Sequence, residues 1–206
     1  MLNHVSQLPF SQACENNKGP ILVELQRIFQ YNQQVLEIGS GTGQHSVHFA
    51  ANLPQLTWQA SDQNSYLTHL NARIELVGTQ NLLPAFGLDV MLDWPVKMIS
   101  AQLDGVFSAN TLHIMSKSMV EAFFQGVGNA LLPKAQLVIY GPFNYQGQYS
   151  SESNASFDEW LKQNNPQSGI RDIEWITALA AQQSFTLIND VEMPANNRLL
   201  HFGRHK

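Results

Sequence analysis

The sequence predicts an α/β fold with helices on both faces of a doubly wound, mostly parallel sheet of seven strands. Five short apolar runs typical of buried strands alternate with helical segments between Gln34 and Gly141. Such alternation indicates right-handed βαβ crossovers and a parallel sheet. Two further strand-like runs within 185–205 are joined by a turn, so they should be antiparallel neighbours, with the last strand running against the others.

Helices are expected where apolar residues recur with the period of a helix face. Pro20 opens the first, because proline is tolerated in a first helical turn, and a capping box of Ser118 and Glu121 opens a later one. The expected helices are 19–30, 43–53, 65–78, 118–132 and 172–184. The expected parallel strands are 34–39, 56–62, 82–90, 103–110 and 136–141, of which 82–90 is interrupted by a proline.

Residues 142–170 break this rhythm. They are polar and aromatic with little periodicity, and they are too many for a simple connection. Because they leave the carboxyl end of the 136–141 strand, we expect them to form a lid over a substrate. No repeat or linker divides the chain, so residues 1–206 are expected to be a single domain.

Composition narrows the classes of partner. A formal net charge of −5 and scattered Lys and Arg residues speak against a nucleic-acid partner. The first residues lack the pattern of a signal peptide and no apolar run is long enough for a membrane span, which predicts a cytoplasmic protein with no membrane partner. The single cysteine, Cys14, excludes an internal disulfide framework.

No metal site is expected. His45 and His48 lie on one predicted helix, and His201 and His205 lie near the end of the sequence. Neither pair has a cysteine or an acidic cluster beside it, as metal sites usually do. We interpret both pairs as surface histidines.

The loop after the first strand carries Gly39, Gly41 and Gly43. In open α/β sheets a ligand lies beyond the carboxyl ends of the strands, and glycines there let the backbone approach it. A dinucleotide fingerprint needs its third glycine where Gln44 stands, which disfavours a nicotinamide cofactor. The alternative to a ligand site is a glycine-rich turn in a packed domain.

Acidic residues near this loop favour a cationic ligand. Glu37 would repel a pyrophosphate but attract the ammonium and sulfonium groups of S-adenosylmethionine. Asp62 can bind both ribose hydroxyls, or Asp62 or Asn64 can cap the following helix. Asp89 can accept a hydrogen bond from the adenine amino group. Three apolar residues beside it either stack on adenine or belong to the core: Met91, Leu92 and Trp94.

Together these residues resemble the class I S-adenosylmethionine-dependent methyltransferase superfamily. The likeness rests on "VLEIGSGTGQ", Asp62, Asp89, "SANTLH" and the late antiparallel strand, over nearly the whole chain. More narrowly, "KGPIL", "YGPF", "SESNASFD", "GIRDIE" and "MPANN" resemble an uncharacterised methyltransferase-like family, a domain of unknown function of the methyltransferase-like 26 type. The resemblance implies a Rossmann-like fold and S-adenosylmethionine as cofactor, but no substrate. The cofactor-binding positions it implies are Glu37, Gly39, Ser40, Gly41, Gly43, Asp62, Asp89 and Asn110.

Methyl transfer depends mainly on alignment and desolvation, and a base is needed only where the acceptor loses a proton. The candidates for catalysis are His113, three residues past Asn110, and Tyr140, at the end of the fifth strand. The alternatives are a hydrogen bond of His113 within its loop and packing of Tyr140 with a satisfied hydroxyl. Asn17 either caps the first helix or helps to bring it over the methionine end of the cofactor.

The substrate side is expected to be polar, aromatic and poor in charge, which suits a small or medium polar molecule. Arg171 would hold a carboxylate or phosphate unless it pairs with Asp172. The "MPANN" run either faces the substrate or simply forms a turn. The expected substrate-binding residues are Tyr145, Tyr149, Asn154, Arg171 and Asn196.

These features predict an S-adenosylmethionine-dependent methyltransferase that acts on an unidentified small molecule. The main alternative is a catalytically silent binding module or sensor with the same cofactor pocket. Gln44 disfavours a nicotinamide oxidoreductase. A nucleic-acid or protein methyltransferase is a further alternative. The acidity of the chain disfavours the former, and "SANTLH" stands where an Asn/Asp-Pro-Pro-Tyr run would follow the fourth strand.

Overall fold

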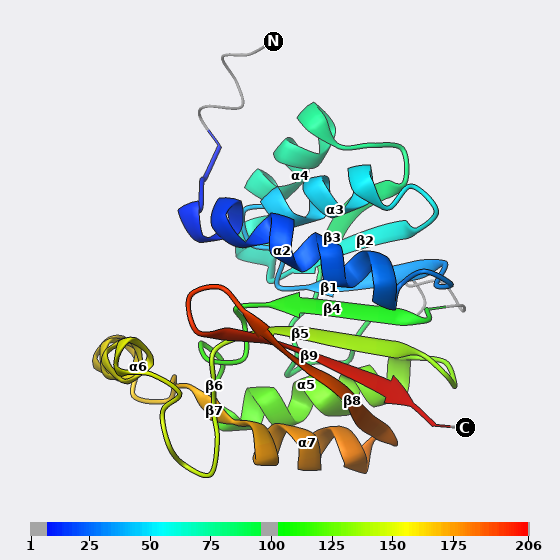
Figure 1. Ribbon diagram of the computed structural model, residues 1–206. Helices are drawn as coiled ribbons and strands as arrows, with labels where there is room; N and C mark the ends of the chain where they lie inside the picture. Colours follow the sequence, from blue (N-terminus) through cyan, green and yellow to red (C-terminus); the bar gives the residue numbers. More distant parts are fainter. Residues whose placement is uncertain (1–7, 96–102, 206) are drawn as a thin grey trace.

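The computed structural model describes residues 8–95 and 103–205, which form a seven-stranded sheet with helices on both faces (Figure 1). All neighbouring strands of this sheet are parallel except for two pairs, β5 with β9 and β9 with β8. The predicted Rossmann-like, doubly wound sheet with a reversed last strand is confirmed. The strands in spatial order are β3 (Leu82–Gly87), β2 (Thr57–Asp62), β1 (Gln34–Ile38), β4 (Gly105–Ala109), β5 (Gln136–Gly141), β9 (Asn197–Arg204) and β8 (Phe185–Met193).

Two hydrophobic cores lie on the two faces of the sheet. Successive strand residues point to opposite faces, so Val35 and Val138 belong to one core while Leu36 and Leu137 belong to the other. The central strands are therefore apolar on both sides, as in other sheets that helices cover completely. Figure 1 shows the two groups of helices on opposite faces: α2 (Gln12–Ile28), α3 (Gln44–Asn52) and α4 (Leu67–Val77) on one, and α5 (Lys117–Ala130) and α7 (Ile173–Gln182) on the other.

The first helix begins earlier than the sequence predicts. Its N-cap is Ser11, so Pro20 lies inside α2. Pro20 removes only the helical hydrogen bond to the carbonyl of Asn16, a residue that solvent reaches. The predictions that Pro20 opens this helix and that Asn17 can cap it are wrong. The added turns are held by contacts of residues 11–17 with the glycine loop and the start of α3.

The N-cap of α5 also differs from the prediction. Ser116 is the cap, and its hydroxyl accepts from the Met119 N–H at 3.2 Å. Ser118 lies in the first turn, with its hydroxyl 2.9 Å from that of Ser116. The predicted capping box of Ser118 and Glu121 is therefore wrong. Two serines spaced two apart offer the same hydroxyl, and only the path of the preceding loop decides which one caps.

Residues 142–170 contain a helix that hydrophobic periodicity does not reveal. This helix, α6 (Glu152–Asn164), lies beyond the carboxyl ends of the parallel strands (Figure 1). Its buried residues are Asn154, Asp158 and Leu161, and because two of these are polar the segment lacks an apolar stripe. Short strands β6 (Phe143–Asn144) and β7 (Arg171–Asp172) pair in parallel at its two ends. Across the described residues, no helix is both long and apolar enough to cross a membrane.

Candidate functional site

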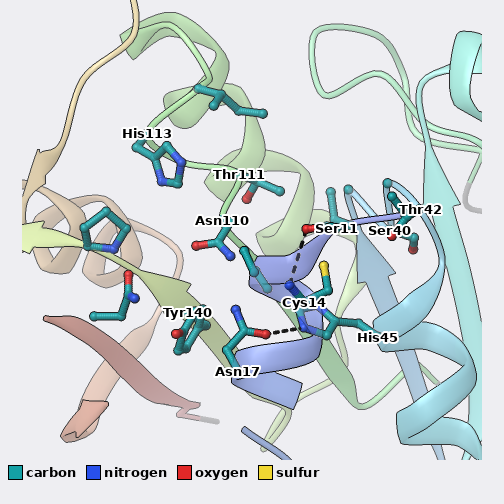
Figure 2. Close-up of a pocket in the computed structure, with 18 of the residues that line it drawn as sticks. Ser11, Cys14, Asn17, Ser40, Thr42, His45, Asn110, Thr111, His113 and Tyr140 are labelled. Carbon is teal, nitrogen blue, oxygen red and sulfur yellow. Dashed lines mark hydrogen bonds between the residues drawn. The ribbon is translucent and has the colours of Figure 1, made fainter. Parts of the chain in front are cut away.

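A cavity of about 810 Å³ lies at the carboxyl ends of the parallel strands. Its walls come mainly from the glycine loop, the loop after β4, the start of α2, α6 and the turn between β8 and β9. Figure 2 shows Asn110, His113 and Tyr140 facing the side chains of α2 across this space. Ligands of open α/β sheets bind at this edge.

The three glycines of the loop are needed for different reasons. All have left-handed backbones, with φ of +77° at Gly39, +52° at Gly41 and +76° at Gly43. A Cβ at Gly39 would lie 2.4 Å from Cγ2 of Thr111, and one at Gly43 would lie 2.7 Å from Cδ1 of Leu70. Packing inside the protein therefore requires these two glycines. A Cβ at Gly41 would meet nothing within 4 Å, so at this position the backbone is open to a ligand in the cavity.

Asp62 lines the cavity beside this loop. Its Oδ2 accepts from the Gly41 N–H at 2.6 Å, and its Oδ1 accepts from the Gln63 N–H at 2.7 Å. Burial raises the pKa of the carboxyl group. The short helix η1 (Asn64–Tyr66) has Gln63 as its N-cap, without a side-chain capping bond, so neither Asp62 nor Asn64 caps it. Ribose binding by Asp62 stays a prediction.

Glu37 and Ser40 support the glycine loop through hydrogen bonds within the protein. The Glu37 side chain is buried and does not line the cavity, because its carboxylate accepts from the hydroxyl of Ser46 and from Nε1 of Trp58 at 2.9 Å. Burial raises the pKa of Glu37 to about 6. Ser40 lines the cavity, and its N–H donates to the Ser61 carbonyl at 3.0 Å. In this arrangement the Glu37 carboxylate is directed to Ser46 and Trp58 rather than to the cavity, and its attraction for a cationic ligand stays a prediction.

Asp89 lies next to the cavity wall rather than in it. Leu88 and Val90 line the cavity, whereas the Asp89 carboxylate accepts from the Met91 N–H at 2.9 Å in a turn. Met91 is exposed and Trp94 is part of the core beneath α5. The structure therefore favours the core interpretation of Trp94 and does not bring the Asp89 carboxylate to the cavity.

Asn17, His45 and Tyr140 form a buried polar group in the cavity wall, as Figure 2 shows. His45 Nε2 lies 2.7 Å from Asn17 Oδ1, and the imidazole stacks on Phe49. Burial lowers the pKa of His45 to about 4, so the ring is neutral at physiological pH and its Nε2 donates to Asn17. Burial raises the pKa of Tyr140, while hydrogen bonding with Asn17 and Asn197 acts in the opposite direction.

The prediction that the histidine pairs lie on the surface is wrong for His45 and for His201, which are both buried. His201 Nε2 lies 2.6 Å from Gln136 Oε1, away from the cavity. A signal for His45 was available, because it lies four residues before Phe49 on the inward face of the helix after the glycine loop. Within residues 8–95 and 103–205, no group of three or more His, Cys, Asp or Glu side chains could hold a metal ion.

Asn110 and His113 lie on the loop that follows β4, and both line the cavity. Asn110 is left-handed, with φ of +58°, and its N–H donates to the Tyr140 carbonyl at 2.8 Å. The edge of the His113 ring packs against Phe157 of α6, with ring centroids 5.3 Å apart. Burial, with a smaller effect of the Arg171 charge, lowers the pKa of His113 to about 4. The imidazole therefore carries a free lone pair at physiological pH.

Of the predicted substrate-binding residues, the cavity lining contains Asn154. Its Nδ2 donates to Ser150 Oγ at 2.8 Å and to the Asn196 carbonyl at 3.0 Å. Asn196 in turn donates to Ser153 Oγ at 3.0 Å. Asn154 and Asn196 thus join α6 to the turn between β8 and β9, and Asn196 itself lies behind the lining.

Tyr145, Tyr149 and Arg171 point away from this cavity. The hydroxyl of Tyr145 donates to Asp190 and that of Tyr149 donates to Asp158, both at 2.7 Å. The buried Arg171 donates to the carbonyls of Leu112 and Met115, on either side of His113. In the described chain Arg171 forms no ion pair with Asp172. Its guanidinium holds the His113 loop, so the expectation that it would bind a carboxylate or phosphate here is not supported.

The match to a family model covers nearly the whole chain. A model described as a protein of unknown function (DUF938) matches residues 8–204. The chain belongs to the DUF938 family. This family description names no activity.

The fold of the DUF938 chain is shared by methyltransferases of known structure. An O-methyltransferase family protein from Burkholderia thailandensis has a TM-score of 0.78 at 14% identity, over 92% of this chain and 56% of its own. The S-adenosylmethionine-dependent methyltransferase SibL in its apo form has a TM-score of 0.77 at 18% identity, over 94% and 56%. PigF with SAH has a TM-score of 0.74 at 12% identity, over 90% and 55%. The DUF938 chain spans just over half of their length, and at these identities the likeness shows a methyltransferase fold.

Proposed function

We propose that this chain is an S-adenosylmethionine-dependent methyltransferase that acts on a small molecule. The observation that carries the proposal is the cavity at the carboxyl edge of a methyltransferase fold. It has the open backbone of Gly41 and the carboxylate of Asp62 on one side and His113 and Tyr140 on the other. The same ligand is supported by the structural neighbours, since SibL is an S-adenosylmethionine-dependent methyltransferase and the structure of PigF was solved with SAH. The narrower likeness to the methyltransferase-like 26 type belongs to this proposal and names no substrate.

The lining fits a cationic cofactor. Among the described residues that line the cavity, Asp62 is the only Asp, Glu, Lys or Arg, so no positive side chain opposes a sulfonium or an ammonium group. Gly39, Ser40 and Gly41 would hold the cofactor from the loop, with Asp62 at its ribose and Asn110 across the cavity. Leu88 and Val90 offer apolar contacts to the adenine.

The chain's own part in the reaction is alignment, exclusion of water and proton transfer. When bound, S-adenosylmethionine supplies an electrophilic methyl carbon, whose bond to sulfur breaks as the acceptor's lone pair forms the new bond. His113 is neutral and lines the cavity, so its imidazole can take the proton that a hydroxyl or amine acceptor loses. Tyr140 lines the same cavity, so its hydroxyl can orient the acceptor by a hydrogen bond.

Turnover tests this proposal. The protein is incubated with a small-molecule extract and S-adenosylmethionine that carries a deuterated methyl group, and both S-adenosylhomocysteine and labelled products are followed by mass spectrometry. We expect both to form together, and to fall in a His113→Asn variant that still binds the cofactor. Cofactor binding without any labelled product would instead favour the silent binding module.

A further inference from the structure

Away from Asp62, the cavity lining, as far as the structure describes it, is polar but carries no charged side chain. Five asparagine carboxamides line the cavity, those of Asn16, Asn17, Asn110, Asn154 and Asn197, and Gln63 adds a sixth beside Asp62. An apolar patch that includes Met115 and Phe157 faces the same space. Among the lining residues that the structure describes, none is Lys, Arg or Glu. The single Asp among them is Asp62, which lies on the glycine-loop side of the cavity.

The two histidines of the lining add no positive charge. The pKa values of His45 and His113 are both lowered to about 4, mainly by burial, so both rings are neutral at physiological pH. The imidazole of His45 already donates to Asn17, which fixes its tautomer. Neither ring therefore supplies a counter-charge for an anionic ligand.

The cations nearest to the cavity are committed to protein partners. Arg171 donates to carbonyls of the His113 loop, and Lys162 pairs with the buried Asp158 one turn earlier on α6. Arg73 donates to the carbonyls of Thr42 and Pro9, both at 2.6 Å. These contacts hold the cavity walls together, so the positive groups are unavailable to a ligand inside.

We propose that the methyl acceptor is an uncharged molecule, held by the carboxamides and the apolar side chains of the cavity lining. An ionised carboxylate, phosphate or ammonium group on the acceptor, away from Asp62 and the glycine loop, would lose its hydration without gaining a counter-charge from a protein side chain. Carboxamides both donate and accept, so they match the hydroxyl, carbonyl and amide groups of a neutral molecule. Transfer of the methyl group to a neutral O–H or N–H releases one proton, which His113 can accept and pass to solvent.

This inference rests on the proposed function for naming the ligand an acceptor, but its test measures binding alone. Three sets of fragments, each small enough to lie wholly inside the cavity, are matched in size and ring content and differ in carrying no charge, a carboxylate or an ammonium group. Ligand-observed NMR scores their binding to protein saturated with S-adenosylhomocysteine. We expect the neutral set to bind at least about tenfold more tightly than either charged set.

A charge introduced at the cavity should change this preference. Ile114 lines the cavity and is 55% exposed, so Ile114→Lys places a cation at the mouth without disturbing the core. We expect this variant to gain binding of the carboxylate set. Ile188→Lys, at a position on β8 that is 53% exposed and outside the cavity, is the matched control and should keep the wild-type preference.

Equal binding of either charged set to the wild-type protein would overturn the inference, and so would the absence of binding by all three sets. Failure of the proposed function shows itself differently. If the protein prefers neutral fragments but forms no S-adenosylhomocysteine in the turnover assay, the inference of an uncharged ligand stands and the proposed methyltransferase activity is contradicted.

Discussion

Nε2 of His45 lies 2.7 Å from Oδ1 of Asn17, so a buried hydrogen bond joins the start of α3 to the first half of α2 in the cavity wall. Asn17 also approaches the hydroxyl of Tyr140. This carboxamide thus sets the position of the His45 ring in the cavity wall. The helix that carries it covers the glycine loop.

Replacement of Asn17 by alanine should therefore destabilise the protein. The change leaves a buried Nε2–H of His45 without an acceptor, at an expected cost of about 1 to 3 kcal/mol in the free energy of unfolding measured by urea denaturation. Asn16→Ala is the neighbouring control, because Asn16 is exposed and its side chain accepts only from the exposed Gln12. Equal stability of the two variants would show that the His45 bond contributes nothing.

Stability should fall as the pH falls below about 6.5. The pKa values of His45, His113 and His201 are lowered to about 4 by burial, whereas the unfolded chain takes up these protons near its ordinary value of about 6.5. The unfolded state therefore binds more protons between these values, and native stability is lost through that window. The pKa of Glu37 is raised to about 6, so this one carboxyl group makes the folded state more stable as the pH falls, opposite to the effect of the three histidines.

Urea midpoints at about pH 7.5 and about pH 5 measure this effect. We expect a lower midpoint at the lower pH, and a smaller difference in His201→Gln, which removes one of the three titrations away from the cavity. A midpoint that is unchanged or higher at about pH 5 would contradict the assignment of neutral buried histidines.

Gly39 and Gly41 should respond differently to alanine. Both positions have positive φ, which costs a Cβ-bearing residue about 1 kcal/mol or more. Gly39→Ala adds a clash with Cγ2 of Thr111, so we expect a further loss of about 1 to 3 kcal/mol in the free energy of unfolding. Thr111→Ser removes that methyl group and keeps the hydroxyl that bonds Ser108, so it should restore part of the loss in the double variant. No recovery in the double-mutant cycle would exclude the contact as the cause.

Arg171→Lys distinguishes the observed role of Arg171 from the predicted one. Lysine keeps the charge but cannot reach both carbonyls of the His113 loop, so the free energy of unfolding should fall by about 1 to 3 kcal/mol. Calorimetric affinity for S-adenosylhomocysteine should stay the same, because Arg171 does not line the cavity. Unchanged stability together with altered ligand affinity would favour the original expectation of an anion-binding arginine.

The sheet could be predicted because its central strands are apolar on both faces, so "VLEI" and "LVIY" stand out in the sequence. The glycine loop could be predicted because left-handed backbone after a buried strand requires glycine. The start of α2 could not be predicted, because its first turns consist of polar residues. Contacts with Gln44 and His45 keep these residues helical.

Side-chain direction limited the prediction of the site. Glu37 stands at the expected position, yet its carboxylate turns under the loop toward Trp58. Arg171 lies on the lid segment but turns to backbone carbonyls. Neither direction follows from sequence spacing, since both depend on which polar partner the folded chain places within reach. The sequence left open whether Asn17 caps a helix or helps to bring it over the cofactor, and its bond to His45 depends on the register of α2 against α3.

Calorimetric titration tests whether the cavity binds S-adenosylmethionine through the glycine loop. The protein is titrated with S-adenosylmethionine and S-adenosylhomocysteine, as are Gly41→Val and Asp62→Ala. Gly147→Val is the matched control, because Gly147 also has positive φ and open space at its Cβ but lies outside this cavity. We predict one-to-one binding that both loop variants weaken and the control retains. No binding of either compound at high concentration by folded protein would contradict the account.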